Sequence, residues 1–355
     1  MTQSRAPRPF RPARPARSWR RTLGALGGTL ALVAAASACS SGSGSLEKPD
    51  LNVGVVAGIG AATFQAGVQQ GDFTQNGLTL NVEPFPTDAA AEQALQKGEI
   101  DVAFGDYSEF LDVATSTVAT QLQVVGEGYN AGENTIGLVT ASGSSLENTT
   151  LTGSDGVAEQ IANGSLSVDV PDMTSPEYLA LANWAITEQQ PLSPTSQRVV
   201  SSANGQASAA AATTMINAVV AGSANAAVLQ EPFLTEALET GKVAELANLD
   251  SGNAENMPIS GYFALSSTVQ KDPNTIGAFQ AALAEAQSLG TSRVEVEGAL
   301  TAEKVTHAVA ATTAIGNYPT EIVSATLTNV LSLMSSAGLA TSGLTAGSLT
   351  GSASD

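Results

Sequence analysis

The pattern of hydrophobic and polar positions from residue 51 to residue 104 predicts three strands separated by two helices. The predicted strands are residues 51–56 (LNVGVV), 78–82 (LTLNV) and 100–104 (IDVAF). The predicted helices, 61–70 and 89–97, are each followed by a glycine that ends the helix, and Asp88 is the expected N-cap of the second. Strands that alternate with helices form right-handed crossovers, so the pattern predicts an α/β fold with mostly parallel sheets.

A second unit with the same pattern follows later in the chain. The segment 98–104 (GEIDVAF) and the segment 222–228 (GSANAAV) each follow a predicted helix, and they lie 124 residues apart. Both strands lead into a polar, acidic loop, which holds Asp106 in the first unit and Gln230 and Glu231 in the second. The repetition favours two similar lobes; the alternative is that any two α/β units resemble each other to this degree.

The remaining pattern adds shorter elements. A strand at 168–170 precedes a loop and a helix at 176–187, whose first residue, Pro176, suits the N1 position. Further strands are expected at 198–200 and 261–265, and further helices at 274–289, 302–313 and 320–335. The last residues, from about Ser342, are rich in Gly, Ser and Thr, and we expect them to be disordered.

The first 38 residues have the pattern of an export signal. Seven arginines fall within the first 21 residues, where no acid occurs, and residues 22–38 are uncharged and mostly apolar. The small residues Ala36-Ser37-Ala38 directly precede Cys39, the only cysteine of the chain. This arrangement resembles a bacterial lipobox, in which the cysteine is acylated and becomes the first mature residue. Residues 1–38 are therefore predicted to be a lipoprotein signal peptide, with lipidation at Cys39.

Two alternatives to lipidation stay open. An ordinary signal peptide would be cut after an A-x-A pattern at 36–38, and an uncleaved anchor is disfavoured because about 17 apolar residues are short for a span. The pair Arg20-Arg21 weakly resembles a twin-arginine signal and leaves the export route open. Residues 39–50 are Ser/Gly-rich and are expected to form a flexible tether on the extracytoplasmic face of the cell membrane.

The charge of the remaining chain excludes several classes of protein. Beyond the leader, 33 acidic residues face only seven basic ones, a formal charge of about −26. Binding to nucleic acid requires clustered Lys and Arg, so no nucleic-acid partner is expected. With one cysteine and one histidine, the chain is predicted to have neither an internal disulfide nor a metal site.

The sequence argues against an enzyme. The single histidine, His307, lies in a predicted helix, and no G-x-S-x-G segment follows a strand to supply a nucleophile. Paired carboxylates for glycoside hydrolysis stay possible because acids are plentiful. No cofactor is expected.

Three segments resemble a known family: GDF..NGL at 71–78, ALQKGEIDVA at 94–103 and AGSANAAVLQEPF at 221–233. Together with the lipobox, they resemble the substrate-binding lipoproteins of ABC importers for nitrate, sulfonates, taurine and thiamine-pyrimidine precursors. The resemblance covers about residues 50–335. It implies a periplasmic-binding-protein-like II fold, in which two α/β lobes are joined by two crossings and close on a ligand by a hinge.

The resemblance also implies how the chain is organised. Lobe 1 is expected at 51–131 and 262–340, lobe 2 at 132–261, and a disordered tail at 341–355. The crossings are expected near residues 129–134 and 258–261, with Gly128, Gly132 and Gly261 as hinge candidates. The expected function is capture of a small molecule by a monomer that delivers it to an ABC importer permease. Alternatives are a sensory or adhesion lipoprotein and a thiamine-pyrimidine synthase, which is disfavoured because that chemistry relies on histidine and a pyridoxal cofactor.

In open α/β sheets a ligand lies beyond the carboxyl ends of the strands, where helix N-termini point. This rule, with the first crossing, gives the expected ligand-binding residues: Ile59, Thr63, Phe64, Thr87, Asp88, Asp106, Tyr107, Ser108, Tyr129, Asn134, Met173, Thr174, Ser175, Gln230 and Glu231. The alternative for the aromatic residues is core packing, and for the acids a solvated loop. Binding of a sulfonate or nitrate would benefit from an arginine in the cleft, and only Arg198 lies in a region of the sequence that could reach it. Neutral or cationic ligands, such as an aminopyrimidine, suit the acidic residues better.

Overall fold

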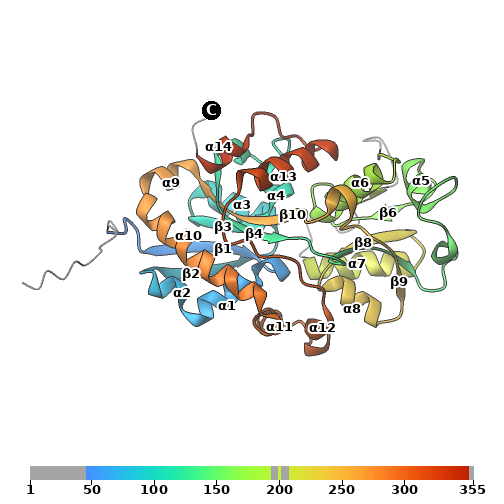
Figure 1. The fold of residues 1–355 in the computed structure, drawn as a ribbon, viewed down its shortest axis with the longest axis horizontal. Helices are drawn as coiled ribbons and strands as arrows, with labels where there is room; N and C mark the ends of the chain where they lie inside the picture. Colours follow the sequence, from blue (N-terminus) through green and yellow to red (C-terminus); the bar gives the residue numbers. More distant parts are fainter. Residues whose placement is uncertain (1–44, 193–198, 201–207, 352–355) are drawn as a thin grey trace, which may run out of the picture. The chain divides into compact units, whose positions relative to one another are not determined.

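The computed structural model describes residues 45–192, 199–200 and 208–351 (Figure 1). The predicted signal peptide, Cys39 and Arg198 lie outside these residues. In the part of the chain that is described, no helix combines the length and the apolar character that a membrane crossing requires. The strands of this part form two sheets of five strands each.

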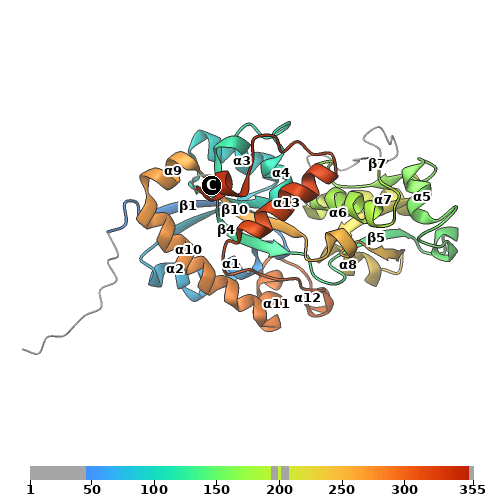
Figure 2. The same ribbon diagram turned by 45° about the horizontal axis from the view of Figure 1, so that its top comes forward.

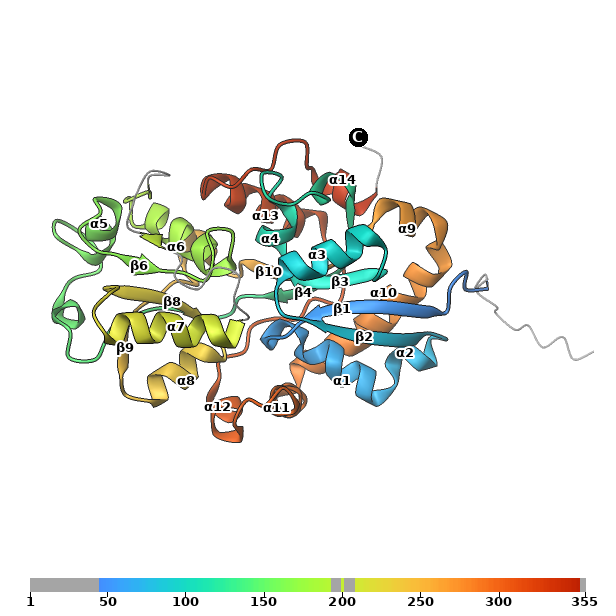
Figure 3. The same ribbon diagram turned by 180° about the vertical axis from the view of Figure 1, so that it is seen from behind.

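The first sheet has the strand order β2-β1-β3-β10-β4. Strand β1 pairs in parallel with β2 and β3, whereas β10 is antiparallel to both β3 and β4. In the view from behind, β1, β2 and β3 lie side by side, with α1 and α2 on one face and α3 on the other (Figure 3). The strands are β1 (Asp50–Val56), β2 (Thr79–Phe85), β3 (Val102–Asp106), β4 (Leu122–Asn130) and β10 (Pro258–Leu265).

The second sheet repeats this arrangement in the order β7-β6-β8-β5-β9. Its central strand β8 corresponds to β3, because each follows a helix, pairs in parallel on one side and antiparallel on the other, and lies 124 residues from its counterpart. The predicted α/β fold with two similar lobes is confirmed. The strands are β5 (Ile136–Ala141), β6 (Val168–Asp169), β7 (Val199–Val200), β8 (Ala226–Gln230) and β9 (Val243–Asn248).

The prediction of mostly parallel sheets is confirmed, since four of the five strands in each sheet run in one direction and only β10 in the first sheet and β5 in the second run against them. The antiparallel pairs all involve β10 in the first sheet and β5 in the second. The chain reaches each of these strands by coming from the other sheet. Parallel neighbours need a crossover connection within one sheet, and a strand that arrives from elsewhere is free of that constraint.

Helices cover both sheets. Around the first are α1 (Ala62–Gln70), α2 (Asp72–Gln75), α3 (Asp88–Lys97), α4 (Tyr107–Leu111), α9 (Ser266–Lys271), α10 (Pro273–Ser288) and α11 (Arg293–Ala302). Around the second are α5 (Val157–Ala162), α6 (Pro176–Thr187), α7 (Ser208–Val220) and α8 (Phe233–Glu239). The C-terminal helices are α12 (His307–Thr312), α13 (Ser324–Ser336) and α14 (Ala346–Thr350).

The start of α3 differs from the prediction. Thr87, not Asp88, is the N-cap, and its side-chain oxygen accepts a hydrogen bond from the backbone N–H of Ala90 at 3.3 Å. Asp88 is the first residue of the helix, so its carboxylate is free to bind elsewhere. The predicted helix at 302–313 is also wrong in part, because α11 ends at Ala302 and the chain breaks before α12, with Lys304 at a positive φ of 74°.

The chain passes between the sheets at residues 131–135 and again at 249–257. The two crossings are bonded to each other, since the N–H of Ala131 donates to the carbonyl of Met257 at 2.8 Å and the hydroxyl of Thr135 donates to Asp250 Oδ2 at 3.0 Å. Two of the three predicted hinge glycines, Gly128 and Gly261, lie inside β4 and β10 rather than in a crossing. They are too closely packed to act as free pivots.

The C-terminal segment also contacts the second lobe. Helix α13 packs against α6 as well as β10, and Figure 2 shows it running from the first sheet towards α6. The amide of Asn183 donates to the carbonyl of Leu333 at 3.2 Å, and the hydroxyl of Tyr178 donates to the carbonyl of Ala337 at 3.2 Å. Residues assigned to lobe 1 from the sequence therefore hold part of lobe 2.

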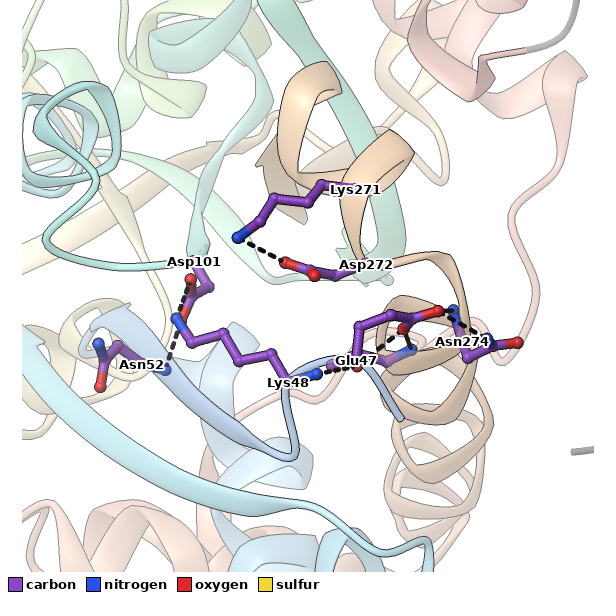
Figure 4. Close-up of polar contacts among 8 residues, drawn as sticks. Glu47, Lys48, Asn52, Asp101, Lys271, Asp272 and Asn274 are labelled. Atoms are coloured by element: carbon purple, nitrogen blue, oxygen red, sulfur yellow. Dashed lines mark hydrogen bonds and ion pairs between the residues drawn. The ribbon is translucent and has the colours of Figure 1, made fainter. Parts of the chain in front are cut away.

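Both ends of the folded part extend further than expected. Helix α14 occupies the expected disordered tail, because Thr345 and Ser348 form a capping box and Leu349 is fully buried against the first lobe. At the other end, part of the expected tether is held (Figure 4). Glu47 accepts hydrogen bonds from the backbone N–H groups at the start of α10, and Lys48 forms an ion pair with Asp101 at 2.6 Å.

Candidate functional site

A cavity of about 200 Å³ lies between the two lobes. Its walls are the loops that follow β1, β2 and β3 in the first lobe and β6 and β8 in the second, together with the start of α7 and of β10. The carboxyl ends of strands from both sheets thus point at one space. This is where open α/β sheets bind ligands, at the end where helix N-termini offer unpaired N–H groups.

Apolar side chains form a large part of the wall. They come from both lobes and from β10: Val56, Ile59, Phe104, Met215, Leu229, Phe233 and Ile259. A cavity with apolar walls and a few polar groups is the usual form of a small-molecule site. Its volume is many times that of one water molecule, so it suits a compact organic molecule.

Six carboxyl groups line the cavity, and four of them form a cluster around Asp106; the other two are those of Asp172 and Glu231. In this cluster Asp88 starts α3, Asp106 ends β3, Glu109 lies in the first turn of α4, and Glu177 lies in the first turn of α6 in the other lobe. Among the described residues that line the cavity, there is no Lys, Arg or His. The charges of the two lobes therefore face each other across the cleft without a basic partner in that lining.

Burial raises the pKa of each carboxyl group of this cluster. The pKa rises to about 6 for Asp88, about 8 for Glu109 and about 7 for Glu177. The pKa of Asp106 lies well above its ordinary value, because burial and the charges of the other three carboxylates all act in the same direction. Ionising all four carboxyl groups together at neutral pH is unfavourable unless a positive charge enters.

Asp88 is positioned by the end of β3. Its Oδ1 accepts a hydrogen bond from the backbone N–H of Asp106 at 2.8 Å. A side chain at Gly105 would place its Cβ 2.1 Å from that oxygen and 2.5 Å from Phe110. The glycine therefore allows α3 and β3 to approach closely enough to join the two acids.

Ser260 adds a neutral group to the same wall. It is 2% exposed, and its hydroxyl has no hydrogen-bond partner among the described residues. Ser260 is the β-ladder partner of Asp106 across β3 and β10, so the two side chains lie on the same face of the sheet. An unpartnered buried hydroxyl costs free energy, and it marks a place where a ligand can supply the missing hydrogen bond.

Glu231 has a different role. Its carboxylate accepts hydrogen bonds from the hydroxyl of Thr235 at 2.6 Å and from the backbone N–H of Ala314 at 3.0 Å. The side chain is 4% exposed, and burial raises its pKa. Glu231 therefore fastens the segment before α13 to the second lobe, although it also touches the cavity.

The described residues hold no group of three His, Cys, Asp or Glu side chains arranged to ligate a metal ion. A profile of the NMT1-like family matches residues 44–299, more than half of the chain. The chain belongs to the NMT1-like family. This family assignment agrees with the resemblance seen in the three sequence segments. No curated protein sequence matches the chain significantly.

Solved structures identify the fold of this NMT1-like protein. The zinc-bound ligand-binding component of an ABC-type import system from Staphylococcus aureus has a TM-score of 0.62 at 15% identity, covering 81% of this chain and 91% of its own. The aliphatic sulphonate-binding protein SsuA of Escherichia coli has 0.60 at 18%, covering 81% and 90%. A Candida albicans protein with the generic periplasmic binding protein fold has 0.58 at 13%, covering 82% and 89%. The predicted periplasmic-binding-protein fold is confirmed.

The structure brings seven of the fifteen predicted site residues to the cavity wall: Ile59, Thr87, Asp88, Asp106, Ser175, Gln230 and Glu231. The other eight lie outside that wall: Thr63, Phe64, Tyr107, Ser108, Tyr129, Asn134, Met173 and Thr174. The aromatic residues among the eight pack in the core. Phe64 contacts Phe73 with ring centroids 5.1 Å apart, Tyr107 contacts Phe263 at 5.5 Å, and Tyr129 contacts Tyr318 at 5.0 Å.

Five polar wall residues escaped the prediction: Glu109, Asp172, Glu177, Ser208 and Ser260. Glu109 had a signal in the sequence, because it lies three residues after Asp106 and thus on the same side of the helical turn. Glu177 had one too, as an acid in the first turn of a helix that starts at a strand's carboxyl end. Ser260 had none, because its place depends on β10 returning to β3 from the other lobe.

Proposed function

We propose that this NMT1-like protein is the extracytoplasmic solute-binding protein of an ABC importer. It captures a small molecule between its lobes and delivers it to the permease as a monomer. The observation that carries the proposal is the cavity, to which strand ends of both sheets contribute. Two structural neighbours are a ligand-binding component of an ABC-type import system from Staphylococcus aureus and an aliphatic sulphonate-binding protein from Escherichia coli. Binding, rather than catalysis, is the role that this site supports.

We propose that the lobes close on the ligand about the crossings at 131–135 and 249–257. Lobe 1 then consists of residues 51–131 and 262–340, and lobe 2 of residues 132–261. Because the crossings are bonded to each other, they form a paired hinge and not two loose linkers. The contacts of α13 and of Glu231 with the neighbouring segment limit how far the lobes separate.

The anchor is part of the proposal. Export with cleavage before Cys39 leaves a lipidated cysteine, a short tether and a folded body that starts near Glu47. The Cys39→Ser variant, expressed in a host that processes bacterial lipoproteins, is expected to leave the membrane fraction. A Ser41→Ala variant serves as control and is expected to stay. Membrane association of Cys39→Ser equal to that of the parent chain would contradict the anchor.

Ligand capture is tested on residues 40–355, since Gly44–Asp355 forms a compact unit by itself. Nitrate, bicarbonate, taurine, alkanesulfonates, thiamine and its aminopyrimidine precursors are screened by thermal shift. A ligand at about 100 times its Kd adds about 2.7 kcal/mol to the free energy of unfolding. Trp184, the only tryptophan after the leader, lies on α6 and gives a second, fluorescence readout of lobe closure. A heterocycle and an anion are both candidates at this step, and a chain that binds neither favours the sensory or adhesion alternative.

A further inference from the structure

The described lining of the cavity is acidic, a feature that ligand capture in general does not require. Asp88, Asp106 and Glu109 contribute carboxyl groups from the first lobe, and Glu177 contributes one from the second. Helix N-termini account for part of this arrangement, because they stabilise nearby carboxylates. Helix N-termini do not account for Asp106. Burial and the charges of its three acidic neighbours all disfavour the charged form of its carboxyl group.

Ser260 is an independent indication at the same place. Its hydroxyl is almost fully buried and unpartnered within the described part of the chain, and it lines the cavity beside Asp106, its partner across the β3–β10 ladder. A Cβ on Gly60 would lie 2.8 Å from the Ser260 Oγ, so the glycine keeps the approach to the hydroxyl open. A hydroxyl oxygen accepts a hydrogen bond from an N–H group, as a carboxylate does.

The rest of the wall limits the size and character of the ligand. An apolar surface is formed by Ile59, Phe104 and Met215, and the described lining contains no basic side chain. A bare ion would leave this surface and most of the 200 Å³ to water. A compact organic body that carries one positive end fills both parts of the cavity.

We propose that the ligand is a small organic cation, a protonated amine or amidine, held between Asp106 and Glu177 with a hydrogen bond to the Ser260 hydroxyl. The proposal rests on the proposed function of ligand capture and adds the chemical class of the ligand. The cation neutralises carboxylates of both lobes at once. Closure of the cleft then becomes favourable, because the charge that separates the empty lobes is compensated when the ligand is present.

The test compares probes of one shape and three charges. Residues 40–355 are titrated at pH 7.5 with benzylamine, benzyl alcohol and benzoate, and with 4-amino-5-aminomethyl-2-methylpyrimidine, taurine, ethanesulfonate and nitrate. Isothermal calorimetry gives the Kd, and Trp184 fluorescence reports on closure. We expect the amines to bind and the matched neutral and anionic probes to bind at least 10-fold more weakly or not at all.

Variants locate the effect. Asp106→Asn and Ser260→Ala are expected to weaken binding of the amines, by about 10- to 100-fold for Asp106→Asn because a charge-assisted hydrogen bond is lost. Glu99→Gln removes an exposed acid far from the cavity and is expected to leave the Kd unchanged. Circular dichroism and melting show that each variant folds. An amine whose Kd is the same in Asp106→Asn and the parent chain overturns the assignment.

The remaining outcomes separate the two proposals. Binding of ethanesulfonate or nitrate, with no binding by the amines, overturns the cationic class and leaves ligand capture intact. If no probe of any charge binds or changes the fluorescence of Trp184, ligand capture itself fails and the cationic class fails with it.

Discussion

Replacing Glu177 by Gln is expected to stabilise the empty protein at alkaline pH. Glu177 lies at the start of α6 and faces the carboxylates of the other lobe. Burial raises its pKa from 4.5 to about 7, and the charge of Asp88 adds to this, while its own N–H and Ser175 oppose it. Between pH 4.5 and 7 the folded protein holds this proton more tightly than the unfolded chain does. The contribution of Glu177 to stability is therefore lost as the pH rises through this window.

The structure gives the size of the effect. The difference between 4.5 and about 7 corresponds to at most about 3 kcal/mol of unfolding free energy above pH 7. Because the side chain is half-buried, solvent screening reduces this to about 1–2 kcal/mol. For roughly 300 ordered residues, that gain raises the Tm by about 2–3 °C. The amide also keeps the volume of the side chain, so packing is unchanged.

The assay is urea unfolding of the parent chain, Glu177→Gln and Glu99→Gln at pH 5 and pH 8 without ligand. We expect the parent chain and Glu99→Gln to lose stability together between the two pH values. Glu177→Gln is expected to lose less and to exceed the parent chain at pH 8. A Glu177→Gln variant that is equal to the parent chain at pH 8, or less stable, would show that the cleft carboxylates are not electrostatically strained.

Two further substitutions, together with one control, test the packing that positions the site and the packing of the C-terminal end. Gly105→Ala is expected to lower the free energy of unfolding by about 1–3 kcal/mol, because its Cβ would lie 2.1 Å from Asp88 Oδ1. The control Gly277→Ala, in open space on α10, is expected to raise it by up to about 1 kcal/mol. Urea unfolding measures both changes. Leu349→Ala is expected to cost about 2–5 kcal/mol by emptying a buried site on α14, measured as a lower Tm, and an unchanged Tm would contradict the docking of this helix.

Much of the fold could be predicted because it is local. The helix 176–187 has the bounds that Pro176 and the apolar periodicity indicated, and Gly71 and Gly98 end α1 and α3 with φ values of 85° and 70°. The 124-residue repetition correctly marked the central strands of both sheets. The directions of β5 and β10 could not be predicted in this way, since they depend on which sheet the chain has just left.

The candidate site, like the fold, could be predicted only where it depends on residues that are neighbours in sequence. The loop rule placed Thr87, Asp88 and Asp106 at the cavity, because a strand end and the following helix start are neighbours in sequence. It failed for Phe64 and Tyr107, whose loops reach the cavity while their side chains turn into the core. Which way a side chain points at the first turn of a helix depends on the helix phase, and residue type alone does not reveal it.

The charge of the cleft is a property of this chain and not of its fold. The neighbours share the fold at 13–18% identity, and a fold by itself does not determine which ligand is bound. Four side chains at strand ends and helix starts form the acidic cluster here, and such positions can be exchanged without disturbing a sheet. Glu109 shows the consequence, because its pKa of about 8 keeps it mostly protonated at neutral pH in the empty protein. A cation that binds there displaces this proton, so its affinity is expected to rise between pH 6 and pH 8, whereas the affinity of an anion would fall over the same interval.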